Sequence, residues 1–348
     1  MTAAYLPNLL AQVRVSNGVV QPLYTEAPAP MGIGDFGVRN TTGTPQGYFL
    51  QTTSWRGILT LNDVNALYLD DGAPDYFGAQ LNTVMTNTTV QGNTTYRYWI
   101  QNVIQYSTKA HTLTFIDNIW NFSNPQASEP ASTFYSGNGT PVDPVFYYDV
   151  GPTFVVPFPF TVYLYENSSL TVGTGPAPRP VWSTVRFGYD IRNAAGARLY
   201  SGIYDTVLFN SNVRENANPP IPKFTVDGFR PNPVGLLDDA ELMIGGPGGG
   251  STTTIFGIAG SERLQFWNTT SLKYENSKTA WNEGTDTGET VEGISEYYTA
   301  PGTVVVGPGP SIPMPFWNAT PGGNIGQAVV QGTVAPSNSF FFFNQGTV

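Results

Sequence analysis

Hydrophobic and polar residues alternate with a period of two in short segments along the chain, and turn-forming residues bound these segments. This pattern is typical of β-strands, and no sustained 3.6-residue period indicates helices. Many short strands joined by turns predict an all-β fold, an antiparallel β-sandwich or jelly roll. The predicted strands are 48–52, 57–61, 96–106, 112–122, 154–165, 181–191, 204–209, 223–226, 241–244, 263–267, 295–298 and 303–306.

Domain boundaries are weakly marked. Loops rich in Gly, Ser and Pro cover residues 124–144 and 173–180, but the segments that they separate have similar composition. A weaker boundary follows the glycines at 245–250, after which the sequence becomes more polar. We therefore predict a β-sandwich core over residues 1–251 and a C-terminal β layer or small subdomain over residues 252–348, which can also belong to one domain with the core.

The composition supports this fold class and limits the partners. Among 348 residues there are 38 Gly, 29 Pro, 19 Tyr and 21 Phe, a mixture that favours strands and turns. Charged residues make up only 11%, and the formal net charge is −10, so no nucleic-acid partner is expected. Low charge density also limits self-repulsion when carboxylates are protonated, which suits a protein that works in acid.

Several catalytic chemistries are excluded or disfavoured. The chain has no Cys, and His111 is its one histidine, in what reads as a polar turn between two strands. Cysteine nucleophiles, disulfides and His-rich zinc sites are therefore impossible, and no GxSxG motif is present. The glycine-rich tract 245–251 lacks the lysine of a phosphate-binding loop and reads as a tight turn. We expect no nucleotide, no metal and no cofactor, which leaves carboxylates helped by amides.

The sequence also carries features of an exported protein. It contains no apolar run that could span a membrane and no secretory leader, so we expect a secreted protein whose signal peptide is not part of this sequence. Attached glycans would agree with export. N-glycosylation motifs begin at Asn40, Asn87, Asn93, Asn121, Asn138, Asn167, Asn268 and Asn318.

Five tracts in a specific order resemble the thermopsins, acid proteases associated with thermoacidophilic archaea. The resemblance implies an endopeptidase that cleaves proteins or peptides at low pH and high temperature and that is grouped historically with aspartic peptidases. The tracts are APAPMGIGD at 27–35, YWIQNV at 98–103, FIDNIWNFS at 115–123, DAELMIGGPGGGS at 239–251 and DTGET at 286–290.

Three segments resemble, more distantly, the fungal glutamic peptidases, which are β-sandwiches with a Gln and Glu dyad. The segments are WIQNV at 99–103, the Trp-containing strand 115–122, and AELMI at 240–244. The resemblance implies that Gln101 and Glu241 are the catalytic dyad. Glu241 would act as general base toward water, and the Gln101 amide would stabilise the oxyanion.

Strand alternation agrees with this assignment, because it places Trp99 and Gln101 on one face of their strand and Glu241 with Met243 on one face of another. Trp99 and Trp120 are the candidate substrate-binding residues. The rival catalytic carboxylates are Asp117, Asp35, Asp239 and Asp286. Asp286-Thr-Gly resembles the loop of pepsin-type enzymes, but that mechanism needs two such loops, and this chain has one.

Two other functions remain open at this point. A noncatalytic archaeal surface or filament protein would have a similar composition. A glycan-binding module or glycosidase would use exposed aromatic rings such as Trp55, Trp99, Trp120 and Trp267 to stack on sugars. The sequence leaves the oligomeric state and the cleavage specificity open.

Overall fold

The computed structural model describes most of the chain. The described residues are 13–16, 19–22, 28–40, 45–68, 75–92, 94–123, 129–142, 146–229, 238–277, 281–283, 288–309 and 311. The statements that follow concern these residues.

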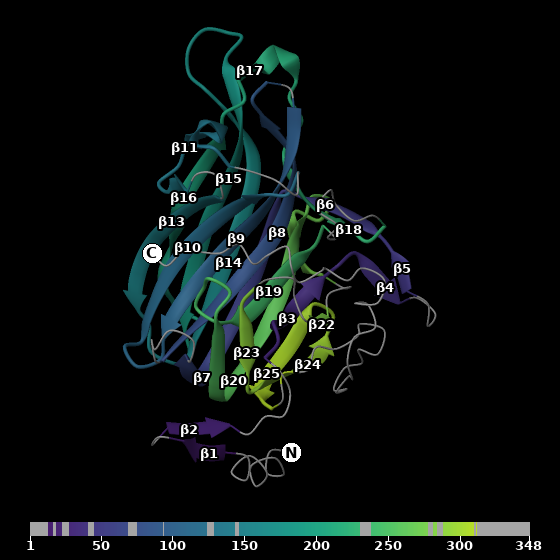
Figure 1. Ribbon diagram of the computed structural model, residues 1–348. Coiled ribbons are helices and arrows are strands. Elements are labelled where there is room, and N and C mark those ends of the chain that lie inside the picture. The colour runs from purple at the N-terminus through teal and green to yellow at the C-terminus, as the bar shows by residue number, and fades with distance from the viewer. Residues whose placement is uncertain are drawn as a thin grey trace.

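Two large β-sheets make up the fold (Figure 1). The ten-stranded sheet contains β3 (Met31–Asp35), β6 (Phe49–Thr52), β8 (Tyr76–Val90), β9 (Thr94–Ser107), β10 (Thr112–Asn121), β12 (Thr140–Val142), β13 (Phe146–Val155), β18 (Lys223–Asp227), β19 (Ala240–Gly245) and β22 (Trp281–Glu283). The eleven-stranded sheet contains β7 (Ser54–Tyr68), β11 (Phe134–Ser136), β14 (Phe160–Val172), β15 (Pro180–Asn193), β16 (Arg198–Phe209), β17 (Val213–Arg214), β20 (Thr252–Asn268), β21 (Lys273–Asn276), β23 (Thr290–Glu292), β24 (Ile294–Ala300) and β25 (Thr303–Pro308).

The remaining elements are small. Two separate hairpins pair β1 (Val13–Ser16) with β2 (Val19–Pro22), and β4 (Val38–Asn40) with β5 (Pro45–Gly47). The helices of the described residues are the short 3-10 turns η1 (Ala131–Thr133) and η2 (Glu215–Ala217). Within the same residues, no helix has the length and apolar character that crossing a membrane requires.

The order of strands in the ten-stranded sheet determines where the site lies. Along its main path the order is β12-β13-β10-β9-β8-β19-β3-β22, and all of these neighbours are antiparallel. Strands β9 and β19, which are far apart in the sequence, therefore lie on the two sides of β8.

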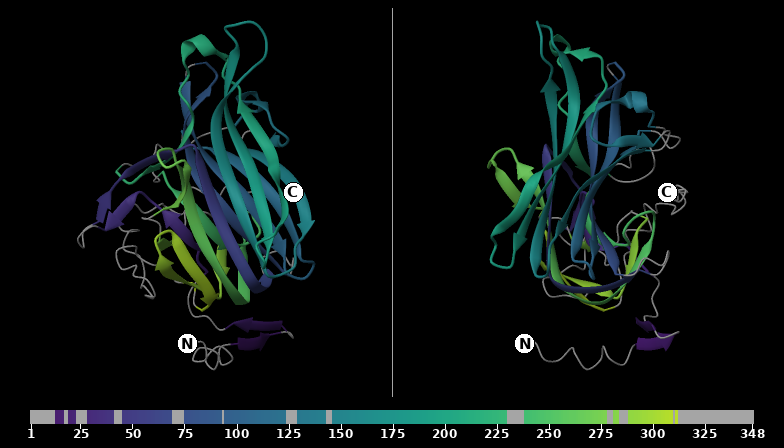
Figure 2. Two further views of the ribbon diagram at one scale, coloured as in Figure 1. Left: turned by 180° about the vertical axis from the view of Figure 1, so that it is seen from behind. Right: turned by 90° about the vertical axis from the view of Figure 1, so that its left-hand side faces the viewer.

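The main hydrophobic core lies between the two sheets, which appear edge-on as two layers in the right-hand view of Figure 2. Leu81, Ile100 and Leu242 contribute to it from the ten-stranded sheet, and Leu59 and Leu164 from the eleven-stranded sheet. Since partners in antiparallel strands share a face, the alternate residues of β8, β9 and β19 point away from this core. We call that side of the ten-stranded sheet the outer face.

The prediction of an all-β fold built from antiparallel sheets is confirmed. One predicted strand, 154–165, is wrong in its extent, because β13 ends at Val155 and β14 begins at Phe160. The break contains Pro157 and Pro159, which lack the N–H that a strand ladder needs. Strand β8 was not predicted, and it is the strand between the two halves of the predicted dyad.

The predicted boundary at residue 251 falls at the turn that joins the two sheets. Strand β20, which begins at Thr252, pairs with β7 from Thr253 to Phe266 and lies within the eleven-stranded sheet. The division of the chain at this point stays a prediction.

Candidate active site

Gln101 and Glu241 lie in one row across the ten-stranded sheet. Gln101 of β9 pairs with Asn82 of β8, and Asn82 pairs with Glu241 of β19. Since paired residues of antiparallel strands point to the same side, all three side chains lie on the outer face. Two strand spacings separate the backbones of Gln101 and Glu241, roughly 9.5 Å. The tertiary structure thus brings together the two residues that the sequence analysis singled out.

Asn82 is the residue of this row that sequence reasoning missed. It is fully buried, with 0% of its surface exposed, and stands between the two members of the dyad. The sequence feature that could have identified Asn82 is its position on one strand face with Gln80 and Val84. The tract NTVMTNTT that begins at Asn82 is mostly polar, however, and both faces of this strand are buried, so the segment does not show the alternation of a half-buried strand.

Hydrogen bonds fix the orientation of the Gln101 amide. The Trp120 indole Nε1 donates to Gln101 Oε1 at 2.7 Å, and an indole N–H can only donate. The atom of Gln101 that faces Trp120 must therefore be its oxygen, and its nitrogen points the other way. Gln101 Nε2 donates to Gln80 Oε1 at 3.0 Å and to Asn82 Oδ1 at 3.3 Å.

The same reasoning orients Asn82. Because Gln101 Nε2 is a donor, the Asn82 atom that it meets must be the acceptor Oδ1. Asn82 Nδ2 then turns away from Gln101, and it is a buried donor without a hydrogen-bond partner. The neighbour of Asn82 on that side of the row is Glu241. The site thus holds an amide donor that makes no hydrogen bond, on a residue paired with Glu241.

Aromatic residues border the row on the side of β9 and β10. Trp99 and Trp120 are paired across these strands and lie on the outer face with Gln101. Trp120 stacks on Phe146 at a centroid distance of 4.3 Å, and Trp99 stacks on Phe122 at 5.5 Å. The two tryptophans form a small hydrophobic cluster with these rings, and Trp120 also holds Gln101.

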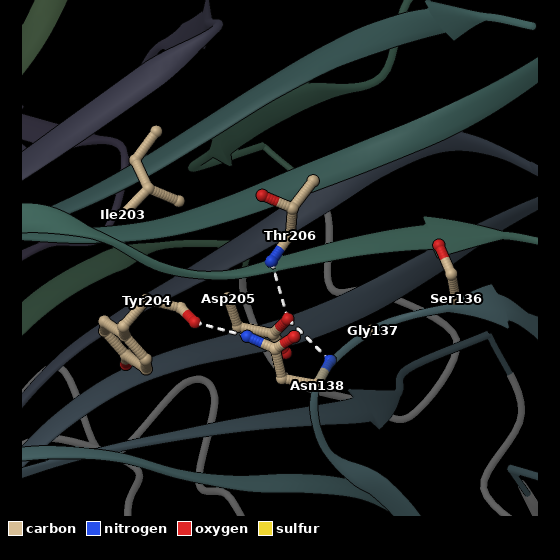
Figure 3. Close-up of a pocket in the computed structure, with 7 residues that line it drawn as sticks. All are labelled: Ser136, Gly137, Asn138, Ile203, Tyr204, Asp205 and Thr206. Atoms are coloured by element: carbon tan, nitrogen blue, oxygen red, sulfur yellow. Dashed lines mark hydrogen bonds between the residues drawn. The ribbon is translucent and has the colours of Figure 1, made fainter.

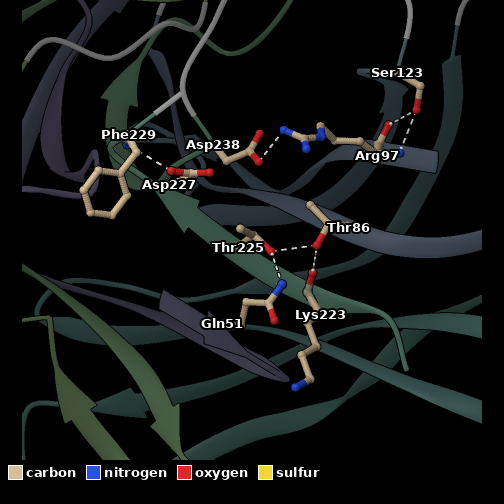
Figure 4. Close-up of polar contacts among 9 residues, drawn as sticks. All are labelled: Gln51, Thr86, Arg97, Ser123, Lys223, Thr225, Asp227, Phe229 and Asp238. Carbon is tan, nitrogen blue, oxygen red and sulfur yellow. Dashed lines mark hydrogen bonds and ion pairs between the residues drawn. The ribbon is translucent and has the colours of Figure 1, made fainter. Parts of the chain in front are cut away.

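The start of β19 is held to β9 by an ion pair. Arg97 Nη1 contacts Asp238 Oδ2, and Asp238 is almost fully buried (Figure 4). Nearby, Thr225 of β18 hydrogen bonds with Thr86 of β8 at 2.6 Å, so β18 is docked onto the same sheet. The ion pair ties the segment just before β19 to β9, and the threonine bond ties β18 to β8.

Of the rival carboxylates, Asp117 and Asp35 lie on the opposite side of the sheet. Asp117 pairs with Asn102, and Asp35 pairs with Ala240, so both point toward the space between the sheets. Asp35 accepts hydrogen bonds from the Gly37 amide at 3.1 Å and from the Tyr48 and Ser277 hydroxyls. Such a carboxylate ties loops to β3 and has little capacity left for a substrate.

The other two rival carboxylates are Asp239 and Asp286. Asp239 is buried and precedes β19, where its backbone oxygen accepts from the Val84 amide at 3.3 Å. Asp286 lies outside the described residues.

The dyad is covered in this structure. Glu241 is 0% exposed and Gln101 is 5% exposed. In this arrangement neither side chain is open to a substrate.

The glycine-rich tract forms a tight turn, as predicted. It joins β19 to β20, contains Gly248, Gly249 and Gly250 with positive φ, and opens no helix. The Ser251 amide donates to Gly248 O at 3.2 Å. His111 also lies in the turn predicted for it, where its Nδ1 is 3.2 Å from the Tyr106 hydroxyl.

The glycosylation motifs stay predictions. Asn93, Asn318 and the side chain of Asn40 lie outside the described residues. Asn138 is exposed, but its Nδ2 donates to Tyr204 O at 2.6 Å, and Asn268 Nδ2 donates to Glu275 at 3.0 Å. The other described sites, Asn87, Asn121 and Asn167, are half-buried on strands.

The fold and the site define an all-β protein in which a carboxyl group and side-chain amides share one face of a sheet. Comparison with known proteins places the chain more narrowly. It matches the thermopsin family over residues 17–294, most of its length, and therefore belongs to that family. The predicted family is thus confirmed.

A curated relative gives a partial match. Thermopsin from Sulfolobus acidocaldarius is 36% identical over 120 residues, which is 33% of this chain and 34% of that protein. The alignment therefore spans about a third of the relative.

Proposed function

We propose that this protein is an endopeptidase that works in acid, with Glu241 as the general base. The observation that carries the proposal is the row Gln101, Asn82 and Glu241, in which three strands present a carboxyl group and two amides on one face. The family to which the chain belongs and the relative named thermopsin support a peptidase. Its substrates would be proteins or peptides.

In the proposed reaction the Glu241 carboxylate takes a proton from a water molecule, which attacks the carbonyl carbon of the peptide bond. The oxyanion that forms needs donors placed in advance. Asn82 Nδ2 can donate without giving up an existing bond, whereas Gln101 Nε2 is already used by Gln80 and Asn82. Gln101 would act by exchanging one of these bonds or by holding Asn82 in place.

Several buried carboxyl groups favour an acidic working range. Burial raises the pKa of Asp117, Glu166 and Glu262, and it raises that of Glu296 to about 8. These groups are neutral in acid, where their burial costs least. Export from the cell and action at high temperature complete the proposal.

The proposal is tested by digestion of a denatured protein at about pH 3, after preincubation in acid because the dyad is covered. The Glu241→Gln variant keeps the size of the side chain but removes the base, and we expect its kcat to fall at least about 100-fold. The matched control is Glu215→Gln at η2, where a half-exposed glutamate pairs with Arg179. It should keep wild-type activity.

Three results would count against this assignment. Full activity of Glu241→Gln would remove Glu241 as the base. If Asp117→Asn lost activity while Glu241→Gln stayed active, the catalytic carboxylate would lie on the other face of the sheet. Cleavage of a polysaccharide, with no cleavage of denatured protein, would show that the protein is a glycosidase and not a peptidase.

A further inference from the structure

Three carboxylates from three strands converge in the space between the sheets, on the side opposite to the proposed dyad. Asp117 of β10 is paired with Asp149 of β13, and Asp205 comes from β16 of the other sheet. One oxygen of each lies within 4.8 Å of the others. We call this group the aspartate triad.

Asp117 is the member of the aspartate triad whose surroundings most favour a bound ligand. Its side chain is 0% exposed, and neither of its carboxylate oxygens has a hydrogen-bond partner. A buried polar group without a partner is costly, and a buried charge more so. Burial raises the pKa of Asp117, and the charges of Asp205 and Asp149 raise it further.

Asp205 is held in place as an acceptor. Its Oδ1 accepts from the backbone amides of Asn138 at 2.9 Å and Thr206 at 2.6 Å, and its Oδ2 accepts from the Tyr147 hydroxyl at 2.6 Å. No lysine or arginine in the described part of the chain forms an ion pair with any of the three aspartates. The negative charge of the triad is therefore not balanced by a side chain.

We propose that the aspartate triad binds one divalent cation of the size of Ca²⁺. Its ligands are all carboxylate oxygens, which hard cations prefer, and it has no nitrogen or sulfur ligand for zinc. Oxygens within 4.8 Å of one another can all reach one ion at the Ca²⁺–oxygen distance of roughly 2.4 Å. An ion there would give the unpaired oxygens of Asp117 a partner.

An open pocket lies beside one member of the triad, Asp205. It has a volume of about 250 Å³ and is lined by residues 136–138 and 203–206. Figure 3 shows the Asp205 carboxylate in this pocket, bonded to the backbone nitrogens of Asn138 and Thr206. A volume of this size holds several waters, which can complete the six to eight oxygen ligands that Ca²⁺ takes.

Protons and the cation compete for the same oxygens. Because metal ligands must be deprotonated, the cation should bind less tightly as the pH falls. The bound ion would offset the repulsion among the aspartates under conditions where that repulsion is largest. Because the triad lies on the side of the sheet opposite to the dyad, the proposed cation site does not depend on the proposed peptidase chemistry.

Terbium luminescence tests the site directly, because Tb³⁺ resembles Ca²⁺ and is excited by nearby tyrosines such as Tyr147 and Tyr204. At about pH 6.5, where free carboxyl groups are ionised, the wild type should bind Tb³⁺ in a saturable way, and Ca²⁺ should displace it. In Asp117→Asn we expect at least a roughly tenfold weaker affinity. The control Asp63→Asn removes an exposed aspartate of β7 and should bind as the wild type does.

Thermal unfolding of the metal-free protein gives a second readout. Added Ca²⁺ should raise the Tm of the wild type and of Asp63→Asn at about pH 6.5, and should have no effect at about pH 3. Asp117→Asn and Asp149→Asn should fold, since each removes repulsion, and at the same Ca²⁺ concentration their Tm should rise less than that of the wild type. Absence of Ca²⁺ binding by the wild type, or equal binding by Asp117→Asn, would overturn the proposal.

Discussion

At the scale of single residues, the orientation of one amide decides what the site can do. Trp120 fixes Gln101, and Gln101 fixes Asn82, so Asn82 Nδ2 is left as a donor without a hydrogen bond. A buried donor without a partner lowers stability. Replacing the Asn82 amide should therefore not destabilise the fold through loss of a hydrogen bond made by Nδ2. This property separates a catalytic role of Asn82 from a structural one.

We predict that Asn82→Ala lowers kcat by about 100-fold and changes KM little, because an oxyanion donor acts in the transition state. Gln101 keeps its bond to Gln80, so the Tm should change little. The measurement is steady-state peptide cleavage together with thermal unfolding. An unchanged kcat would show that Asn82 is a spacer, even if Glu241→Gln is inactive.

Asn82→Asp adds a signature in the pH profile. Its carboxyl group can donate a hydrogen bond when protonated and cannot when ionised. Activity of this variant should therefore be confined to the acid side of the wild-type profile. A profile that merely scales down at all pH values would argue against a donor.

At the scale of elements, the neighbours of β19 determine the position of Glu241. The strand is paired with β8 on one side and with β3 on the other. Gly32 of β3 faces Met243, and a Cβ placed there would lie 2.3 Å from Leu242 O and 2.6 Å from Met243 Cα. A backbone contact of this kind cannot be relieved by a side-chain rotation.

We predict that Gly32→Ala destabilises the protein by roughly 1–3 kcal/mol and also lowers activity, because β3 must shift away from β19. Gly257→Ala in β20 is the control, since a Cβ there meets nothing within 4 Å. The checks are chemical denaturation and peptide cleavage. Equal stability of the two variants would show that β3 and β19 are not held this closely.

The elements also show how far the sequence predicted the site. Gln101 and Glu241 were named because their segments resemble those of the fungal glutamic peptidases, and strand alternation agreed with that assignment. Strand β8 was missed because Asn and Thr are frequent in it and because both of its faces are buried, which removes the alternation. Asn82 was missed with it.

At the scale of the whole molecule, buried carboxyl groups couple stability to pH. Burial and the charge of Glu296 raise the pKa of Glu262, and burial raises that of Glu296 to about 8. Burial also raises the pKa of Asp117 and Glu166. The folded protein therefore binds more protons than the unfolded chain above the ordinary carboxyl pKa, and its stability falls as the pH rises.

Asp190 acts in the opposite direction. Partial burial works against ionisation, but hydrogen bonds from Arg192 and Arg198 hold its pKa below the ordinary value. Its contribution is present near neutral pH and is lost in strong acid. Glu215 acts in the same direction, because hydrogen bonds from Arg179 lower its pKa, whereas Asp149 joins the groups whose pKa burial raises.

We therefore predict that the metal-free protein has its highest Tm at about pH 3–4 and loses stability toward neutral pH. Glu262→Gln resembles the protonated side chain and should raise the Tm on the order of 5 °C at about pH 7, with little change at about pH 3. Asp63→Asn, which changes an exposed aspartate of β7, is the control. A Tm that rises from pH 3 to pH 7 in the metal-free wild type would contradict the prediction.

The sequence by itself determined the all-β fold and which neighbours share a strand face with Gln101 and Glu241, because alternation within a strand is a local property. It also determined the family, because the tracts that resemble the thermopsins are read directly from the chain. Only the tertiary structure decided that β8 separates β9 from β19, that Asn82 stands between the dyad residues, and that Asp117 meets Asp205 on the other side. Pairing partners distant in the sequence are selected by packing over the whole molecule, which no local pattern contains.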